Sequence, residues 1–481
     1  MPDLQAHYPL EPSASDMQAM GQDILTRIVE HLDQLSQMPS CGDIEAQALC
    51  SELGKEPTPD GETPLKEVLD PLFSDWIPRS FTTPGPGYLG FIPGGGVFTS
   101  ALADFIATAT NRYTGVWKAA PVLLQLESNV LRWFAEWMGM PSTTRGLLTT
   151  GGSQANFGAI VSARESLLGE ALRDGVLYTS SQTHLCVRKS ARLAGILPDR
   201  VRVVGVDAKY RMRVDELAET IQADRAEGLK PFFVASSAGT TNTGSIDPIS
   251  DIADLCTKEG LWHHVDGAYG AFFYLCPDLQ PRLAGLPRAD SIALDPHKSL
   301  FLPYGTGALL VRDGKVLRAA HAATAEYLPE PQGHEEFYEP SQYGPELSRD
   351  YRGLRAWLPL KVHGVSAFRA ALIEKHELAV SAAKRVAALP GVVMDADPQL
   401  SLFAFHLSWT GSDQAAENAS TQQMLERVNA RGRVMITGCS VAGQFMARVC
   451  VLCFRTHAES MDRCVEDIAT EVAAAMAEKV A

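Results

Sequence analysis

The stretch Ser291–Gly307 reads SIALDPHKSLFLPYGTG and decides the fold prediction. An apolar run, Ile292–Leu294, reaches Asp295-Pro296-His297-Lys298, and a second apolar run, Gly307–Val311, follows a turn that contains proline and glycine. Two buried strands are predicted, with Lys298 at the mouth between them. A lysine withdrawn from water there would have a lowered pKa and could form a Schiff base with a carbonyl compound. The alternative is a surface lysine in a loop, and only companion residues elsewhere in the chain can overturn it.

The segments before and after this stretch alternate between strands and helices. Apolar runs are separated by segments of helical length at VLYTS, VRVVGV, PFFVASSAG, LWHHVDGAYG, SIALD and GALLVRD. Strands that are apolar on both sides indicate an α/β fold with a largely parallel sheet covered on both faces. Ligands bind such sheets at the carboxyl ends of the strands. That edge is where we place Ser153, His184, Thr241, Asp266 and Lys298.

A phosphate site is predicted at one of these strand ends. Gly146–Thr150 reads as a short buried strand, Gly151-Gly152-Ser153 as a turn, and the residues from Phe157 onward as a helix. Such a helix N-terminus directs free N–H groups and the positive end of the helix dipole at one point, which suits a phosphate. The Gly-Lys-Ser/Thr of a nucleotide P-loop is missing, and an ordinary glycine turn is the alternative.

Two further residues give Lys298 a chemical context. Asp266 ends an apolar strand, where a carboxylate is costly unless a cation meets it. The protonated pyridine nitrogen of pyridoxal phosphate (PLP) would be such a cation; capping of the next turn is the alternative. His184 opens a helix and could lie flat over a planar ring or simply cap that helix.

Length, composition and charge limit the class of protein. The 481 residues are enough for one large domain with a smaller one, and the composition is ordinary for a globular protein. The formal net charge of -15 argues against nucleic-acid or anionic-membrane partners. No stretch approaches the roughly 18 apolar residues of a membrane span. The start, MPDLQAHYPLEPSASD, lacks the basic and apolar regions of a signal peptide, so a cytoplasmic location is expected.

No metal site is predicted from the cysteines. Of the 9 cysteines only Cys450 and Cys453 have Cys-x-x-Cys spacing, and no second pair or histidine cluster completes a zinc site. Both lie in the apolar run VCVLCF, where we expect them to be buried as small hydrophobic groups.

The N-terminal part contains a helix and a glycine motif. Residues 16–38 place apolar side chains at helical spacing after a Ser/Asp cap, and this stripe can pack on its own core or on a partner subunit. The motif GPGYLG (Gly85–Gly90) matches Gly-x-Gly-x-x-Gly, but a dinucleotide fingerprint needs a strand before it and a helix after it. Prolines flank and interrupt the motif, so we expect an extended loop and no nicotinamide-dependent dehydrogenase.

Five motifs in the observed order and spacing resemble one family. The sequences TTGGSQAN, THLCVRKSARLAG, SSAGTTNTGSIDP, WHHVDGAYG and ADSIALDPHK are similar to those of the PLP-dependent group II decarboxylases, the aromatic-L-amino-acid, glutamate and histidine group. The resemblance runs from about Gly87 to the C-terminus. It implies fold type I, the aspartate aminotransferase fold, and a homodimer with active sites at the subunit interface. It therefore favours partner-subunit packing for the N-terminal helix.

The resemblance also implies a domain organisation. Residues 1–85 would be an N-terminal helical dimerisation segment, and residues 86–370 a large PLP-binding domain. Residues 371–481 would be a small α+β domain. The polar segment at about 321–350, rich in Glu, Pro, Tyr and Gly, would be a mobile lid.

Roles for single residues follow from the same resemblance. Lys298 would hold the cofactor covalently, Asp266 would pair with its pyridine nitrogen, and His184 would stack on its ring. Tyr327 in the lid would deliver a proton to the α-carbon. The remaining implied cofactor contacts are Ala268 on the other ring face, Gly152, Ser153 and His297 around the phosphate, and Thr241.

The implied reaction is simple decarboxylation of an amino acid. Relatives that make aldehydes tend to carry phenylalanine at the lid tyrosine or asparagine at the stacking histidine, and Tyr327 and His184 match neither. Phe91, Ile92 and Tyr113 match apolar residues of aromatic-substrate pockets, which favours tryptophan, tyrosine, DOPA or phenylalanine. Arg448 matches a substrate-side arginine found in both acidic- and aromatic-substrate relatives.

Three departures from the family pattern leave the substrate open. Ser299 replaces the usual tryptophan, Gly115 a common pocket aromatic, and Lys118 adds a charge. One alternative is a decarboxylase of glutamate, aspartate or 2,4-diaminobutyrate on the same fold. A more distant alternative is a non-catalytic binding relative.

Overall fold

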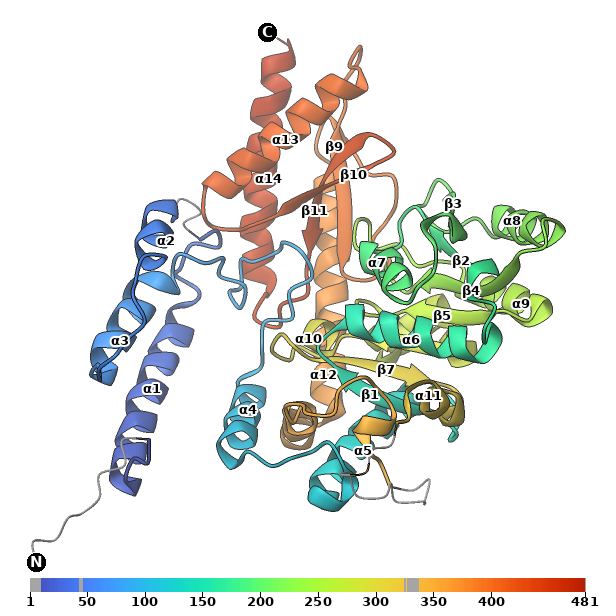
Figure 1. Ribbon diagram of the computed structural model, residues 1–481. Coiled ribbons are helices and arrows are strands. Elements are labelled where there is room, and N and C mark those ends of the chain that lie inside the picture. The colour runs from blue at the N-terminus through green and yellow to red at the C-terminus, as the bar shows by residue number, and fades with distance from the viewer. Residues whose placement is uncertain (1–9, 43–45, 324–325, 327–336, 481) are drawn as a thin grey trace, which may run out of the picture.

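The computed structural model describes residues 10–42, 46–323, 326 and 337–480. In these residues a large body contains the main sheet, a smaller domain contains a second sheet, and an N-terminal helical arm lies to one side (Figure 1). The N-terminal helical arm consists of α1 (Ala14–Gln34), α2 (Gln47–Leu53) and α3 (Leu65–Pro71). Helix α1 begins with the predicted cap, since Ser13 and Asp16 form a capping box.

The main sheet has seven strands in the order β1-β7-β6-β5-β4-β2-β3. Strand β7 runs antiparallel to both of its neighbours, and the other pairs are parallel, which confirms the predicted mainly parallel sheet. Its strands are β1 (Arg145–Thr149), β2 (Gly175–Ser180), β3 (Val201–Val204), β4 (Lys230–Ser237), β5 (Trp262–Asp266), β6 (Ser291–Leu294) and β7 (Gly307–Val311).

Helices cover both faces of this sheet, which explains why its strands lack an alternating pattern. In β2, Tyr178 packs into a cluster with residues of α8 and α9, whereas its neighbour Leu177 packs into the cluster that contains α6 residues. Both faces of the sheet are therefore shielded from water, so the side chains that alternate between the two faces of each strand must be apolar. The helices of the body are α4 (Phe98–Thr110), α5 (Pro121–Trp137), α6 (Gly152–Leu167), α7 (Leu185–Leu193), α8 (Val214–Ala226), α9 (Ile249–Glu259), α10 (Pro296–Ser299) and α11 (Gly314–His321).

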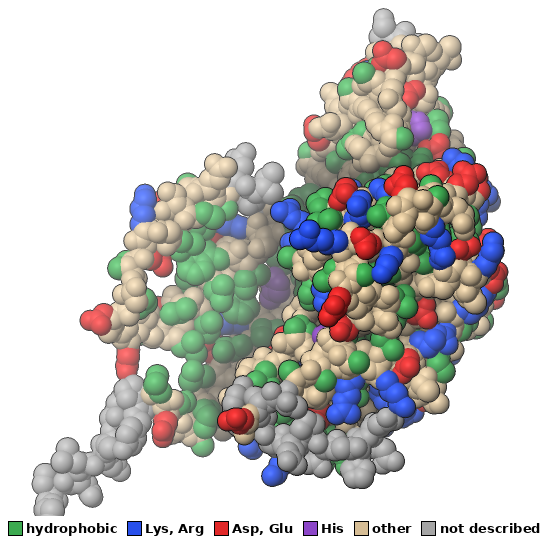
Figure 2. All heavy atoms as spheres, turned by 45° about the vertical axis from the view of Figure 1, so that its right-hand side comes forward, with side chains coloured by type: hydrophobic (Ala, Val, Ile, Leu, Met, Phe, Trp, Pro, Cys, Tyr) green, Lys and Arg blue, Asp and Glu red, His purple; other side chains and the backbone are tan. Residues whose placement is uncertain are grey.

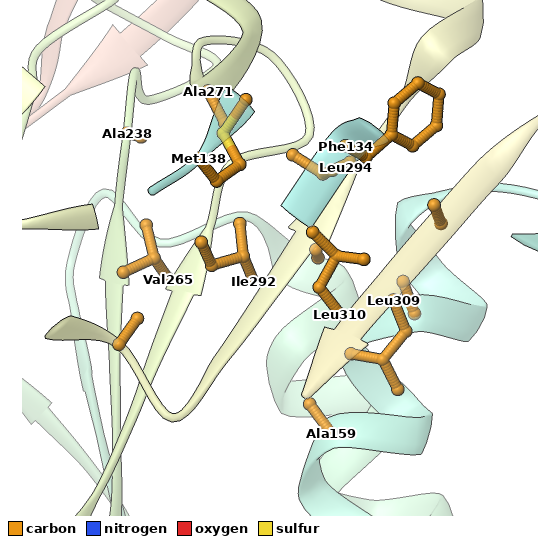
Figure 3. Close-up of a cluster of buried hydrophobic side chains, with 14 of the residues drawn as sticks. Phe134, Met138, Ala159, Ala238, Val265, Ala271, Ile292, Leu294, Leu309 and Leu310 are labelled. Atoms are coloured by element: carbon orange, nitrogen blue, oxygen red, sulfur yellow. The ribbon is translucent and has the colours of Figure 1, made fainter. Parts of the chain in front are cut away.

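The core beneath the sheet holds β5, β6 and β7 in register. Figure 3 shows Val265, Ile292 and Leu310 from these strands among the buried side chains, and Leu309 on the other side of β7, toward Ala159 of α6. Phe134 of α5 meets Phe272 edge to face, with ring centroids 5.2 Å apart. Because β5 and β6 end in Asp266 and in the turn that carries Lys298, this packing fixes the relative positions of the two polar residues.

The smaller sheet has four antiparallel strands in the order β10-β11-β9-β8. The long helix α12 (Gly353–Ala387) connects the two parts, and its helical conformation breaks at Gly364, where φ is 70°. The expected domain boundary at 370/371 falls inside the second half of α12. The other elements are β8 (Val392–Val393), β9 (Leu402–Leu407), α13 (Gln414–Ala430), β10 (Thr437–Val441), β11 (Gln444–Cys450) and α14 (Ala458–Val480).

The GPGYLG motif forms a loop, as predicted, but it is not extended throughout: it begins with a turn, and Tyr88 forms an isolated β-bridge to Met435. No helix follows the motif until α4. It contacts the small domain, since Leu89 N donates to Met435 O and Met435 N donates to Gly87 O, each at 2.9 Å. A Cβ atom on Gly87 would lie 2.4 Å from Arg433 O, so the glycine permits this close approach. None of the helices in the described part of the chain is long and apolar enough to cross a lipid bilayer.

Leu310 tests the contribution of this core to stability. Leu310→Ala removes a fully buried side chain and should lower the free energy of unfolding by about 2–5 kcal/mol. Leu193→Ala makes the same chemical change where the side chain is 67% exposed, and it should change stability by less than about 0.5 kcal/mol. Urea unfolding followed by circular dichroism measures both, and equal effects would contradict the assignment of Leu310 to the core.

Candidate active site

A cavity of about 360 Å³ opens at the carboxyl ends of the central strands. It is lined by every residue predicted to contact the cofactor: Gly152, Ser153, His184, Thr241, Asp266, Ala268, His297 and Lys298. A larger hollow of about 400 Å³ lies beside α5 and β1 and contains none of these residues. Polar residues that are far apart along the chain therefore lie together in one cavity. It is the smaller of these two cavities.

The glycine turn before α6 forms one wall of the cavity. Helix α6 begins at Gly152 after Gly151, and no side chain caps it. The first amide groups of a helix have no intrahelical acceptors, so they remain available to an anion. A Cβ atom on Gly152 would lie 3.0 Å from both Ala268 Cβ and Asp295 Oδ2, which explains the glycine.

Lys298 lies on the short helix α10 and forms an ion pair within the cavity. Its Nζ lies 2.8 Å from Asp295 Oδ2. Burial by itself lowers the pKa of Lys298, but the Asp295 carboxylate outweighs burial, and the pKa is raised above its usual value. The lowered pKa predicted from burial is therefore wrong for this chain without a bound cofactor.

Asp266 occupies the end of β5 and is almost fully buried. Its Oδ1 accepts a hydrogen bond from Ala268 N at 3.2 Å, and its Oδ2 accepts one from Asn156 Nδ2 at 3.3 Å. Burial raises the pKa of Asp266, and the Lys298 charge opposes that shift. No ion pair of Asp266 is found among the described residues, so this carboxylate can receive a cation from a ligand.

His184 caps its helix, as one of the two predictions had it, and it also lines the cavity. Its Nδ1 accepts a hydrogen bond from Cys186 N at 3.3 Å and so caps α7, while the residue lines the cavity. Desolvation lowers the pKa of His184, against the opposing charge of Asp266. The ring is therefore neutral at neutral pH and suited to stacking on a planar ligand.

His297 is oriented by the backbone of the next turn. Its Nδ1 donates to Thr306 O at 2.7 Å, and its Nε2 lies 3.6 Å from Asp295 Oδ2. Desolvation lowers the pKa of His297, with Asp295 acting in the opposite direction.

The structure adds residues that the sequence did not single out. Asp295 and Asn156 line the cavity together with Cys186, Ser237 and Tyr269. Asp295 is the first residue of DPHK and Asn156 the last of TTGGSQAN, so both stood in quoted motifs. Neither was assigned a role: the histidine and carboxylate partners of Asn156 lie on β5, a different element, whereas the pairing of Asp295 with Lys298 is local to the DPHK turn and could have been found from the i, i+3 spacing.

The residues predicted to bind substrate lie outside this cavity. Phe91 is 54% exposed and Tyr113 42% exposed, whereas Ile92 is buried. Arg448 is buried; its Nη1 donates to Thr437 Oγ1 at 2.8 Å and its Nη2 to Phe91 O at 3.0 Å. Tyr327 lies outside the described residues.

Comparison with known proteins decides the family. Residues 70–408 match the model of the pyridoxal-dependent decarboxylase conserved domain. The chain belongs to this family. This decarboxylase is 32% identical over 463 residues to the aromatic-L-amino-acid decarboxylase of Bacillus atrophaeus, with 94% of each chain covered. It is 29% identical over 457 residues to tryptophan decarboxylase TDC2 of Camptotheca acuminata, covering 92% of this chain and 91% of the relative.

Solved structures confirm fold type I for this decarboxylase. The structure of Oryza sativa TDC with PLP and tryptamine aligns with a TM-score of 0.91 at 24% identity, covering 97% of this chain and 99% of that one. Catharanthus roseus tryptophan decarboxylase in complex with L-tryptophan aligns with a TM-score of 0.88 at 24% identity, covering 97% and 100%.

PLP is the cofactor of this decarboxylase, and the residues of the cavity fit it. A lysine amine, a buried carboxylate without a cation among the described residues, and the uncapped N-terminus of α6 match its aldehyde, pyridine nitrogen and phosphate. The Oδ1 atom of Asp295 is buried and accepts no hydrogen bond within the described residues, so it remains available as an acceptor.

Asp295→Asn tests the ion pair to Lys298. The neutral amine is the reactive form of lysine, so loading of PLP onto the cofactor-free enzyme should accelerate as the pH rises through the pKa of Lys298. Removing the carboxylate lowers that pKa and should move the loading profile to lower pH. Absorbance measurements of PLP uptake between pH 6 and pH 10 check this. Asp254→Asn removes the exposed carboxylate that pairs with Arg288 and is the control; a profile unchanged by Asp295→Asn would contradict the argument.

Proposed function

We propose that this enzyme decarboxylates an aromatic L-amino acid to the corresponding amine and carbon dioxide. The observation that carries the substrate class is the 32% identity to the Bacillus atrophaeus aromatic-L-amino-acid decarboxylase over 94% of both chains. Tryptophan, tyrosine, DOPA and phenylalanine are the candidate substrates, and tryptophan and tyrosine decarboxylases are also among the similar proteins.

The residues of the cavity divide the work of holding PLP. Lys298 would hold it covalently, the Asp266 carboxylate would pair with its pyridine nitrogen, and His184 would stack on its ring. Ala268 would contact the opposite ring face. When bound, PLP supplies the electron sink that accepts the electron pair left by departing carbon dioxide. Thr241 would add a cofactor contact, and Gly152, Ser153 and His297 would surround the phosphate.

Tyr327 and the segment around it would complete the reaction. The tyrosine would donate a proton to the α-carbon of the substrate, so that an amine is released. Residues 321–350 would act as a lid that excludes water during this step and suppresses side reactions such as aldehyde formation.

The substrate side of the site would be shared between two subunits. Phe91 and Tyr113 are exposed in the single chain, which supports their packing against a second copy. Ile92, which is already buried within the chain, would contribute beside Phe91. Arg448 would contribute through the Phe91 carbonyl to which it donates. Ser299 is fully buried and donates to Tyr269 O, so its hydroxyl is directed into the protein interior.

The N-terminal segment, residues 1–85, would form the core of this homodimer. Helix α1 has no buried residue, and Met17, Met20, Leu25 and Val29 on it are exposed. Figure 2 shows hydrophobic side chains gathered over the N-terminal helical arm. Such a surface favours burial against a second copy. Residues 86–370 would bind PLP, and residues 371–481 would form the small domain.

A substrate panel tests the proposed activity. The purified holoenzyme should release carbon dioxide from tryptophan, tyrosine, DOPA or phenylalanine and should yield the amine rather than the aldehyde, as product analysis by mass spectrometry can show. Lys298→Ala should reduce turnover to background. Turnover confined to glutamate, aspartate or 2,4-diaminobutyrate would contradict the aromatic assignment, and a parent protein that cannot take up PLP would indicate a non-catalytic relative.

The dimer can be tested with charged variants. The parent should have twice the chain mass of 52.1 kDa by light scattering. Val29→Asp places a carboxylate on the exposed apolar face of α1 and should shift the population toward monomers, since desolvating an unpaired charge at an interface is unfavourable. Val203→Asp, at an equally accessible site on β3 at the far edge of the main sheet, should leave the mass unchanged. A monomeric parent would refute the homodimer.

A further inference from the structure

Strand β5 carries a row of polar side chains that leads away from the cavity. Trp262, His264 and Asp266 alternate along the strand, so they project from the same face of the sheet. Ser291 at the start of β6 lies opposite His264 in the strand register, and Asn156 reaches the row from α6. All five side chains are buried. Ser291, His264 and Asn156 lie behind Asp266 and have no part in the roles assigned so far.

Hydrogen bonds join these five residues into one chain. Trp262 Nε1 donates to Ser291 Oγ at 2.8 Å, and Ser291 Oγ lies 2.7 Å from His264 Nδ1. His264 Nε2 lies 2.6 Å from Asn156 Oδ1. Asn156 Nδ2 completes the chain by donating to Asp266 Oδ2 at 3.3 Å.

The chemistry of the end groups sets the direction of the chain. An indole nitrogen can only donate, so Ser291 Oγ accepts from Trp262 and its own hydrogen is free to donate to His264 Nδ1. His264 then carries its hydrogen on Nε2 and donates to Asn156 Oδ1. This leaves the Asn156 Nδ2 group to donate to Asp266 Oδ2 and to Cys186 Sγ, each at 3.3 Å. Burial lowers the pKa of His264 to about 3, so the ring has one hydrogen, as this arrangement requires.

The opposite arrangement would need a protonated Asp266. The Asp266 hydroxyl would donate to a rotated Asn156 amide, and His264 would donate to Ser291 from Nδ1. Ser291 Oγ would then accept from both Trp262 and His264, and its own hydrogen would have no acceptor among these four neighbours. The donor-only indole therefore favours the arrangement in which Asp266 is ionised.

We propose that Trp262, Ser291, His264 and Asn156 form a positioning relay that keeps Asp266 ionised and directed at the pyridine nitrogen of PLP. The proposal deepens the assigned role of Asp266 and rests on its pairing with that nitrogen. Asp266 also faces Lys298, His184, Asp295 and Cys186, so the relay acts in addition to these charges and dipoles. Because burial raises the pKa of Asp266, donors from behind are needed to hold its charge.

Substitutions that remove those hydrogen-bond donors of the relay that lie outside the cavity test the proposal. His264→Phe keeps a planar ring but deletes both nitrogens, and it should accelerate PLP dissociation from the holoenzyme by roughly 10- to 100-fold, the range found for outer partners of metal ligands. The value of kcat should fall more than KM changes. His264→Gln retains an amide donor toward Asn156 and should restore much of the loss. Trp262→Phe removes only the terminal donor and should give a smaller effect of the same kind.

The adjacent histidine provides a matched control. His263 lies on the same strand, is also buried, and its Nε2 pairs with Ser236 Oγ at 2.8 Å on the other face. His263→Phe should therefore leave the rate of PLP dissociation close to that of the parent, although it removes a buried hydrogen bond of the same type. Thermal unfolding of the cofactor-free proteins measures the purely structural cost of each substitution.

Three outcomes would overturn the relay: parent-like PLP retention in His264→Phe, equal losses in the His263 and His264 variants, or no recovery in His264→Gln. Should His264→Phe fail to fold, Trp262→Phe against His263→Phe gives the comparison, and equal PLP retention in these two variants would overturn the relay. PLP retention is read from absorbance and does not depend on the substrate. A parent that retains PLP but decarboxylates no aromatic amino acid would contradict the proposed function and leave the relay comparison intact.

Discussion

The site depends on one buried negative charge. Asp266 lies at the end of an apolar strand, and the described part of the chain supplies hydrogen bonds to it but no ion pair. A buried carboxylate is costly unless a cation and good hydrogen bonds compensate it. The folded chain therefore has a preformed binding site for a cationic ring nitrogen, and the bound cofactor is not needed to create it. The short turn to Ala268 and the contact with Asn156 hold the two oxygens in place.

An ion pair within the cavity would govern how the cavity accepts the cofactor. Lys298 and Asp295 are three residues apart on the turn into α10, so their proximity is a local feature of the DPHK sequence. The pair keeps the lysine charged in the free chain, although burial alone would favour the neutral amine. Covalent attachment of the cofactor at Lys298 would break this pair and leave Asp295 available to neighbouring groups such as His297.

In the single chain the predicted cofactor-binding residues share one cavity, whereas the predicted substrate-binding residues lie outside it. The cofactor residues converge because they follow strands of one sheet, whereas Phe91 and Tyr113 lie on segments outside the cavity, with much of their surface exposed. The exposed apolar face of α1 has the same explanation if both surfaces are buried against a second copy. An enzyme arranged in this way would couple assembly to the completion of its substrate pocket.

The sequence by itself determined the strands, the helices that separate them, and the sheet edge where Lys298, Asp266, His184 and Ser153 would meet. These predictions rest on local features of the sequence: runs that are apolar on both sides, glycine turns, and polar residues at strand ends. Each can be recognised from a few consecutive residues without knowledge of the tertiary structure. Only the tertiary structure decided that β7 runs antiparallel between β1 and β6, that Asp295 reverses the expected pKa shift of Lys298, and that Asn156 links His264 to Asp266. These features depend on distances between residues on different elements, or on a balance between burial and charge. Neither the spacing nor the composition of the sequence contains those quantities.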